Sequence, residues 1–336
     1  MLLVLTAAIS GVCIGYYLPP VYELFSTLYF MNISIPIAVL IILLLTPQFI
    51  CWENYRAEFT SVFRKRLPLI LIVCANWIIS PLMGFLSANI FFPENVFYRI
   101  GVSLLFLGPS ISMVLYWNKI AAGCKSLVIS ATLINTFLII TLYPLLAYFL
   151  ISRAGAFIPL ENMFFTIPLF FLTPLVLGLI LQYIFKSRAH NCLSNRVYSA
   201  TDKISLISFF MFLVVLYIIQ SRLIISKPLE FVILSIPVLF GYLLVFFIIL
   251  VLSFLGRLSY EEAASACIIG TGNQYELAIA ASIIIFGVGS SVFFVVSIGP
   301  LLEAPVMIII IRLLKTYKMH FLRDRKTEYV KNNVVS

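Results

Sequence analysis

The stretch GTGNQYELAI, residues 270–279, places two amides and a carboxylate in an otherwise apolar part of the sequence. The chain has 336 residues, of which 62% are hydrophobic and only 10% are charged. A soluble domain is about half apolar and about one quarter charged, so this chain has too few polar residues to cover a surface exposed to water. The composition predicts a polytopic membrane protein. We therefore expect Asn273, Gln274 and Glu276 to lie within the bilayer, where polar side chains are costly and commonly functional.

Several other classes of protein are disfavoured by the composition. The net charge is +9, but the basic residues fall in short segments between apolar stretches, which is typical of membrane topology rather than of nucleic-acid binding. The six cysteines are scattered singly without a C-x-x-C pair, so we predict neither a metal site nor a disulfide framework. No histidine lies in a predicted helix and no H-E-x-x-H motif is present. An enzyme embedded in the membrane is therefore disfavoured, and no cofactor is expected.

Apolar stretches of spanning length are divided by proline, asparagine or charged residues. They predict an all-α fold of ten transmembrane helices, at residues 2–18, 32–51, 67–92, 98–117, 124–151, 162–185, 203–221, 229–255, 261–287 and 290–315. If the N-terminus is cytoplasmic, 18 of the 22 Lys and Arg residues fall on the cytoplasmic side and 4 fall outside. This bias follows the positive-inside rule, so we predict a multi-pass protein of the plasma membrane with both termini in the cytoplasm.

An internal duplication is indicated by the number of helices. Five predicted helices lie in residues 1–155 and five in residues 156–317, followed by a basic tail, residues 318–336, that we expect to be solvated and to attract anionic lipid. A repeat with an odd number of helices must insert in the opposite orientation to its copy. The sequence therefore predicts two inverted five-helix repeats, a plan that is common in secondary transporters.

Corresponding helices of the two repeats carry matching breaks. The fourth predicted helix has Gly108 and Pro109 in its middle, and the ninth has Gly270 and Gly272. Proline removes a backbone donor, and glycine permits unwound geometry. Broken helices at matching positions of inverted repeats are typical of a transport site near the bilayer midplane.

Two of the thirteen acidic residues, Glu276 and Glu303, lie well inside predicted helices. A carboxylate at bilayer depth costs about 2.5–3.5 kcal/mol on insertion scales, and transfer out of water favours its neutral form. We therefore predict that Glu276 carries a proton during the transport cycle and keep Glu303 as a secondary candidate. Asn118 is a further secondary candidate, although hydrogen bonding between helices explains such a residue better.

Two motifs carry a resemblance to a known family. They are GPSISMVLYWNKIAAG at residues 108–123, and GNQYELAIAASIIIFGVGS at residues 272–290 with GPLLEAPVM at residues 299–307. On these motifs, and over nearly its whole length, the chain resembles the arsenite efflux permeases of the bile acid:sodium symporter superfamily. The resemblance implies broken fourth and ninth helices that cross near the midplane. It also implies export of trivalent arsenite, or sometimes antimonite, in exchange for protons, with the motif glutamate of the family at Glu276.

The chain departs from this family at one position. The motif cysteine of the family falls on Ser110. Trivalent arsenic prefers sulfur ligands, and a hydroxyl group cannot form an arsenic–sulfur bond. Ser110 can still hydrogen-bond a hydroxylated oxyanion, so we predict a substrate site made by Ser110, Asn273, Gln274 and Glu276. Cys267 is a candidate replacement thiol, although an inert buried cysteine is more common.

The sequence is compatible with two transport functions. The first is export of a trivalent metalloid oxyanion in exchange for protons, and the second is sodium-coupled symport of an organic anion. In the second, carbonyl and amide groups around Asn273 and Gln274 would coordinate Na⁺. A receptor built on the same fold is less expected, because the sequence shows no soluble signalling domain. For either transport function we expect a bundle that contains both broken helices to move against a panel of the remaining helices.

Overall fold

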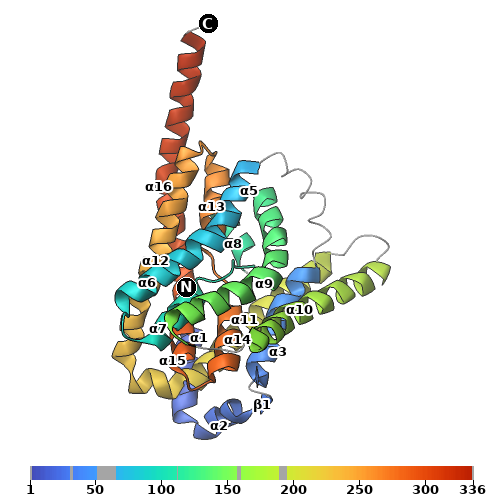
Figure 1. The fold of residues 1–336 in the computed structure, drawn as a ribbon. Coiled ribbons are helices and arrows are strands. Elements are labelled where there is room, and N and C mark those ends of the chain that lie inside the picture. Colours follow the sequence, from blue (N-terminus) through green and yellow to red (C-terminus); the bar gives the residue numbers. More distant parts are fainter. Residues whose placement is uncertain are drawn as a thin grey trace.

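The computed structural model describes residues 2–30, 33–50, 66–111, 113–156, 160–188 and 195–334. These residues are mostly helical, as predicted, and a short antiparallel hairpin joins β1 (Tyr29–Phe30) to β2 (Ile33–Ser34) (Figure 1). The helices are α1 (Leu2–Tyr17), α2 (Pro19–Thr27), α3 (Ile35–Ile50), α5 (Arg66–Cys74), η2 (Ala75–Ile79, a π-helix), α6 (Ser80–Phe91), α7 (Val96–Leu105), α8 (Val114–Ile120), α9 (Lys125–Ala154), α10 (Leu160–Arg188), α11 (Asn195–Ser226), α12 (Pro228–Leu255), α13 (Tyr260–Thr271), α14 (Tyr275–Phe286), α15 (Ser291–Val296) and α16 (Gly299–Val334).

Each of the ten predicted ranges overlaps one helix or a run of consecutive helices. Within the described residues, five helical segments are long and apolar enough to cross a membrane. A sixth is added if α1 and α2, which are bent by 103° relative to one another, form one broken span. The protein is therefore a multi-pass membrane protein by length and composition, and the count of ten spans stays a prediction.

The π-helical turn η2 has a local cause in the sequence. It ends two residues before Pro81, which has no N–H group and whose ring would clash with the carbonyl group four residues earlier. The widened turn moves this carbonyl aside, and the Ser80 N–H donates to the Ala75 carbonyl oxygen five residues earlier. Such single π-turns within α-helices occur often at functional sites.

The first and the last predicted helices differ from the structure, whereas the breaks in the fourth and ninth helices were expected. The predicted first helix ends at residue 18, where Pro19 begins a separate helix α2 that the sequence analysis did not predict. The fourth and ninth predicted helices are each divided in two, as expected from their glycine and proline residues. The last predicted helix, residues 290–315, is divided into α15 and a long α16 that continues to Val334, so the predicted tail begins inside a helix. Residues 335–336 of that tail lie outside the described residues.

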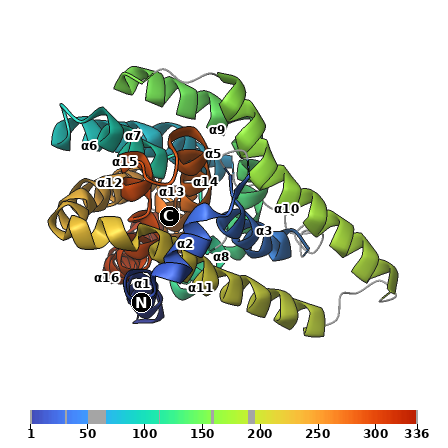
Figure 2. The same ribbon diagram turned by 90° about the horizontal axis from the view of Figure 1, so that it is seen from below.

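The helices form two groups that we call the panel and the bundle (Figure 2). In the panel, α11 packs against α1 and α3, and α3 packs against α10. In the bundle, α12 packs against α6, α13 and α16, while α7 packs against α6 and α15. The bundle also contains α5, η2, α8, α9 and α14, so both broken helices belong to it.

Small residues allow a close contact between α1 and α11 in the panel. A Cβ atom added at Gly11 would lie 2.6 Å from the Val214 carbonyl oxygen, and one added at Gly15 would lie 2.5 Å from the Ile218 carbonyl oxygen. The two glycines are four residues apart on one face of α1, which is the small-residue pattern of closely packed membrane helices. Panel and bundle are connected directly by Tyr217 on α11, whose hydroxyl group donates to the Ser297 carbonyl oxygen at 2.9 Å.

Candidate functional site

The two helix breaks meet inside the bundle and pair with each other. Pro109, between α7 and α8, and Asn273, between α13 and α14, form an isolated antiparallel β-bridge. The Ser110 N–H donates to the Gly272 carbonyl oxygen at 2.9 Å, and the Gln274 N–H donates to the Gly108 carbonyl oxygen at 3.0 Å. Backbone groups that have no helical partner at one break are thus hydrogen-bonded to the other break. An apolar environment requires such pairing. We call this pairing the crossing.

The four predicted break residues take different roles at the crossing. Gly108 has a φ of +79°, which side-chain-bearing residues rarely adopt, and an added Cβ atom would lie 2.9 Å from the Tyr143 ring. Pro109 and Gly272 lie in the unwound segments themselves. Gly270 lies in the last turn of α13 rather than in the break. Its lack of a side chain permits close packing, because an added Cβ atom would lie 2.8 Å from that of Ala75.

The Gln274 side chain connects the two unwound segments directly, and the Asn273 side chain contacts Ser80 of α6. Gln274 Oε1 accepts a hydrogen bond from the Ile111 N–H at 3.0 Å. Asn273 Oδ1 lies 3.2 Å from the Ser80 hydroxyl oxygen, which is also 3.1 Å from the Phe106 carbonyl oxygen. Ser80 was not predicted as a site residue, although its position directly before Pro81 in an apolar helix was a usable signal.

Several buried polar atoms at the crossing have no hydrogen-bond partner among the described residues. They are Ser110 Oγ, Thr271 Oγ1, Asn273 Nδ2 and Gln274 Nε2. Ser110 is 2% exposed and sits directly between the paired Pro109 and the hydrogen-bonded Ile111. Buried polar groups are normally hydrogen-bonded, so a cluster of such atoms indicates a place where a polar solute or water can bind.

The two predicted glutamates belong to one buried polar cluster. Glu276 is fully buried in the first turn of α14, and Glu303 on α16 is 4% exposed. Both carboxyl groups lie close enough to Tyr242 and to each other to interact electrostatically. Two carboxyl groups held together away from water titrate as a coupled pair, because the second charge is more costly than the first. The cluster is therefore chemically suited to hold and release a proton.

The two remaining candidates, Asn118 and Cys267, lie apart from the unwound segments. Asn118 Oδ1 accepts a hydrogen bond from the Ser265 hydroxyl group at 2.8 Å, which ties α8 to α13. An added Cβ atom at Gly123 would collide with the same amide oxygen, so this turn is closely packed. Cys267 is fully buried in the interior of α13. Within the described part of the chain, no group of three His, Cys, Asp or Glu residues is placed to bind a metal ion.

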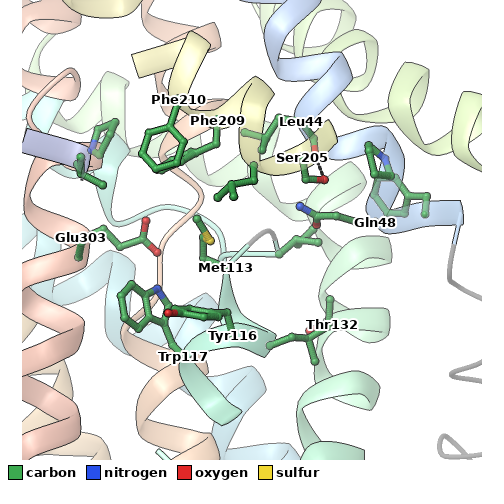
Figure 3. A pocket seen from close by; sticks show the side chains of 18 of the residues that line it. Leu44, Gln48, Met113, Tyr116, Trp117, Thr132, Ser205, Phe209, Phe210 and Glu303 are labelled. Carbon is green, nitrogen blue, oxygen red and sulfur yellow. Dashed lines mark hydrogen bonds between the residues drawn. The ribbon is translucent and has the colours of Figure 1, made fainter. Parts of the chain in front are cut away.

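A cavity of about 660 Å³ lies between panel and bundle, next to the crossing (Figure 3). Panel residues of α1, α3 and α11 line one side, and Ile111, Met113, residues 115–117, α9 and α16 line the other. The lining is mostly apolar and aromatic, with polar side chains at Gln48, Thr132, Thr136, Ser205 and Glu303. Of the predicted site residues, only Glu303 lines this cavity. The other lining residues were not predicted, because each is of a type common in membrane helices and only the fold brings them together.

Comparison with known proteins gives concordant matches. The model described as the sodium bile acid symporter family matches residues 38–227. The arsenical-resistance protein Acr3 of Alkaliphilus metalliredigens is 28% identical over 319 residues, which cover 91% of this chain and 88% of that protein. An uncharacterized transporter of Synechocystis sp. is 25% identical over 336 residues, covering 94% and 87%. The Acr3 protein of Corynebacterium glutamicum is 26% identical over 287 residues, covering 82% and 77%.

Proposed function

Since the chain belongs to the sodium bile acid symporter family, we propose that it is a secondary active transporter that works by alternating access. The observation that carries this proposal is the position of the cavity, which lies between panel and bundle and next to two paired helix breaks. A relative movement of the two groups would change the side from which such a cavity is reached. The breaks would stay paired during this movement, because both belong to the bundle.

We propose the predicted topology as the frame for this movement. It consists of ten spans in two inverted repeats, residues 1–155 and 156–317, with the crossing near the midplane. In support, Ile111 and Gln274, which are hydrogen-bonded across the crossing, are 163 positions apart in the sequence. This separation is close to the length of one proposed repeat, as expected if the two breaks are equivalent positions of a duplicated unit.

The direction in which the cavity opens follows from the proposed orientation. Its lining comes from the first turn of α1, the last turn of α3 and the N-terminal parts of α9 and α11. The positive-inside rule assigns these helix ends to the cytoplasm, where both termini would also lie. At the opposite end of the molecule, β2 packs against α14 and connects panel to bundle there. We therefore assign the structure to an inward-facing state in the plasma membrane.

For the substrate, we propose a trivalent metalloid oxyanion that is exported in exchange for protons. Two of the relatives are named as arsenical-resistance proteins. The Ser110 hydroxyl group and the amides of Asn273 and Gln274 offer unpaired polar atoms to a hydroxylated solute. Ser110 replaces a thiol in this scheme, so the substrate is held by hydrogen bonds and is released more easily than from an arsenic–sulfur bond.

We propose Glu276 as the proton-carrying group, coupled to Glu303. Protonation of this pair from the outer side would weaken substrate binding, and release of the proton to the cytoplasm would restore it. The proposal is supported by the burial of both carboxyl groups within one polar cluster. Sodium-coupled symport of an organic anion is the second candidate. The cavity volume of about 660 Å³ supports an organic substrate, because it lies in the range of pockets for drug-sized molecules.

The test uses inverted membrane vesicles in which the proton or the sodium gradient is imposed separately. The protein is expected to accumulate arsenite when the proton gradient is imposed. Glu276→Gln should reduce this accumulation by at least about tenfold and keep exchange of arsenite for arsenite, because exchange needs no net proton movement. Glu261→Gln is the matched control, since Glu261 is an exposed glutamate at the start of α13. Accumulation that requires sodium and ignores the proton gradient would replace this proposal with the second candidate.

A further inference from the structure

The cavity between panel and bundle is too large and too apolar for a metalloid oxyanion alone. Its volume of about 660 Å³ falls in the range of pockets for organic ligands of drug size. Aromatic side chains form two facing walls: Tyr116 and Trp117 of α8 lie on one side, and Phe209 and Phe210 of α11 lie on the other (Figure 3). Flat aromatic walls of this kind bind an apolar or aromatic body by stacking and dispersion.

The described lining of the cavity contains an acidic residue and no basic one. Glu303 is an acidic residue of the lining, and no Lys, Arg or His occurs among the described lining residues. Its Oε1 atom is buried without a hydrogen-bond partner among the described residues. The carboxyl group lies near Trp117 and Tyr275, but Trp117 Nε1 and the Tyr275 hydroxyl group do not reach it with hydrogen-bond geometry. An anion placed here would meet the Glu303 carboxyl group and find no cationic partner among the described lining residues, which is unfavourable in a medium of low dielectric constant.

The polar groups of the cavity are arranged at two ends. Glu303 of the bundle and Gln48 of the panel point toward each other from opposite sides, with Met113 between them (Figure 3). Gln48 Oε1 also lacks a hydrogen-bond partner among the described residues. An occupant that satisfies both ends has a hydrogen-bond donor at the Glu303 end, an apolar body, and a second donor at the Gln48 end.

We propose that this cavity binds an organic molecule that is positively charged or neutral, with an ammonium or hydroxyl group at Glu303 and an apolar or aromatic body between the two aromatic walls. Glu303 then determines specificity, because it accepts a hydrogen bond from a cationic or neutral donor and repels an anion. A cation at this place also lies beside Trp117, whose ring face attracts positive charge. The inference rests on the proposed function in that it takes this cavity to be a substrate site of the same transporter, in addition to the crossing, whose residues Ser110, Asn273 and Gln274 do not line it.

The experiment compares three small probes with the same ring system, of which one is cationic, one is neutral and one is anionic. They are 2-naphthylmethylamine, 2-naphthylmethanol and 2-naphthoate, and their binding to the full chain in lipid nanodiscs is measured by equilibrium dialysis against empty nanodiscs. The amine is expected to bind at least about tenfold more tightly than the carboxylate, since a charge-assisted hydrogen bond replaces a repulsion. The alcohol should lie between them. Equal or tighter binding of 2-naphthoate would overturn the proposal without the need for any variant.

Variants assign the preference to Glu303. Glu303→Gln keeps the size of the side chain and is expected to bring the affinities for amine and alcohol within about twofold of each other. Glu230→Gln is the matched control, because Glu230 at the start of α12 interacts with Tyr98 and Lys227 far from the cavity lining. A Glu303→Gln protein that elutes as a folded monodisperse species and keeps the full amine preference would contradict the assignment. Binding at equilibrium requires no gradient, so failure of arsenite accumulation and failure of this proposal are separate results.

Discussion

Ser110 lies at the position where the motif of the arsenite efflux permeases, which this chain resembles, has a cysteine. It lies at the crossing, its backbone N–H is bonded to Gly272, and its hydroxyl oxygen has no partner among the described residues. A thiol at this position would be equally buried and would face the same unwound segment. Exchange of the Ser110 oxygen for sulfur would therefore change the affinity of this position for arsenic, while the fold maintains the geometry of the site.

We expect Ser110→Cys to lower the arsenite concentration for half-maximal transport by roughly tenfold or more, because a thiolate is a much better ligand for trivalent arsenic than a hydroxyl group. The measurement is the initial rate of uptake into inverted vesicles as a function of arsenite concentration. Ser103→Cys is the control, since Ser103 is equally buried on α7 but precedes the unwound segment. The same half-maximal concentration in both variants would show that Ser110 does not contact the substrate.

At the scale of elements, the crossing depends on backbone conformations that few residues can adopt. Gly108 combines a φ of +79° with contact to the Tyr143 ring, while its carbonyl oxygen accepts the hydrogen bond from the Gln274 N–H. A side chain at Gly108 would therefore strain one strand of the β-bridge and push against α9. Because both unwound segments share these hydrogen bonds, strain in one of them is transmitted to the other.

Gly108→Ala is expected to destabilise the protein by about 1–2 kcal/mol from the left-handed backbone conformation alone, with a further loss from contact with Tyr143. Thermal unfolding in detergent should show this as a lower midpoint temperature than that of the unaltered protein. Gly289→Ala provides the comparison, because an added Cβ atom there meets open space and its φ lies outside the strained region. Equal midpoints for the two variants would mean that the crossing does not depend on the conformation of Gly108.

The sequence was sufficient to predict elements whose cause is local. Pro109 and Gly108 marked the fourth helix as broken, and Gly272 marked the ninth, because the missing donor and the permissive backbone are properties of these residues themselves. The pairing of Ser80 with Asn273 and the separate helix α2 were not predicted. Ser80 and Asn273 are 193 positions apart, and nothing in either segment alone encodes their contact.

In the molecule as a whole, the cavity between panel and bundle could not be predicted from the sequence either. Gln48, Trp117, Phe209 and Glu303 come from four distant segments, and only the packing of panel against bundle brings them together. Glu303 was recognised as unusual by its depth in an apolar helix. Its position in a cavity whose described lining residues include no basic one could be seen only in the structure. Transport by alternating access requires that panel and bundle move so that this cavity is reached from each side of the membrane in turn.

Accessibility of the cavity from each side of the membrane tests that claim most directly. Thr132 lines the cavity on α9, and Thr132→Cys can be examined in a background whose native cysteines are replaced by serine. The measurement is the rate of labelling by a thiol reagent that does not cross membranes, in inside-out and right-side-out vesicles. The account predicts rapid labelling from the cytoplasmic side without a gradient, and increased labelling from the outer side when arsenite and an outward-acidic proton gradient are both present. Labelling from the same side under all conditions would contradict it.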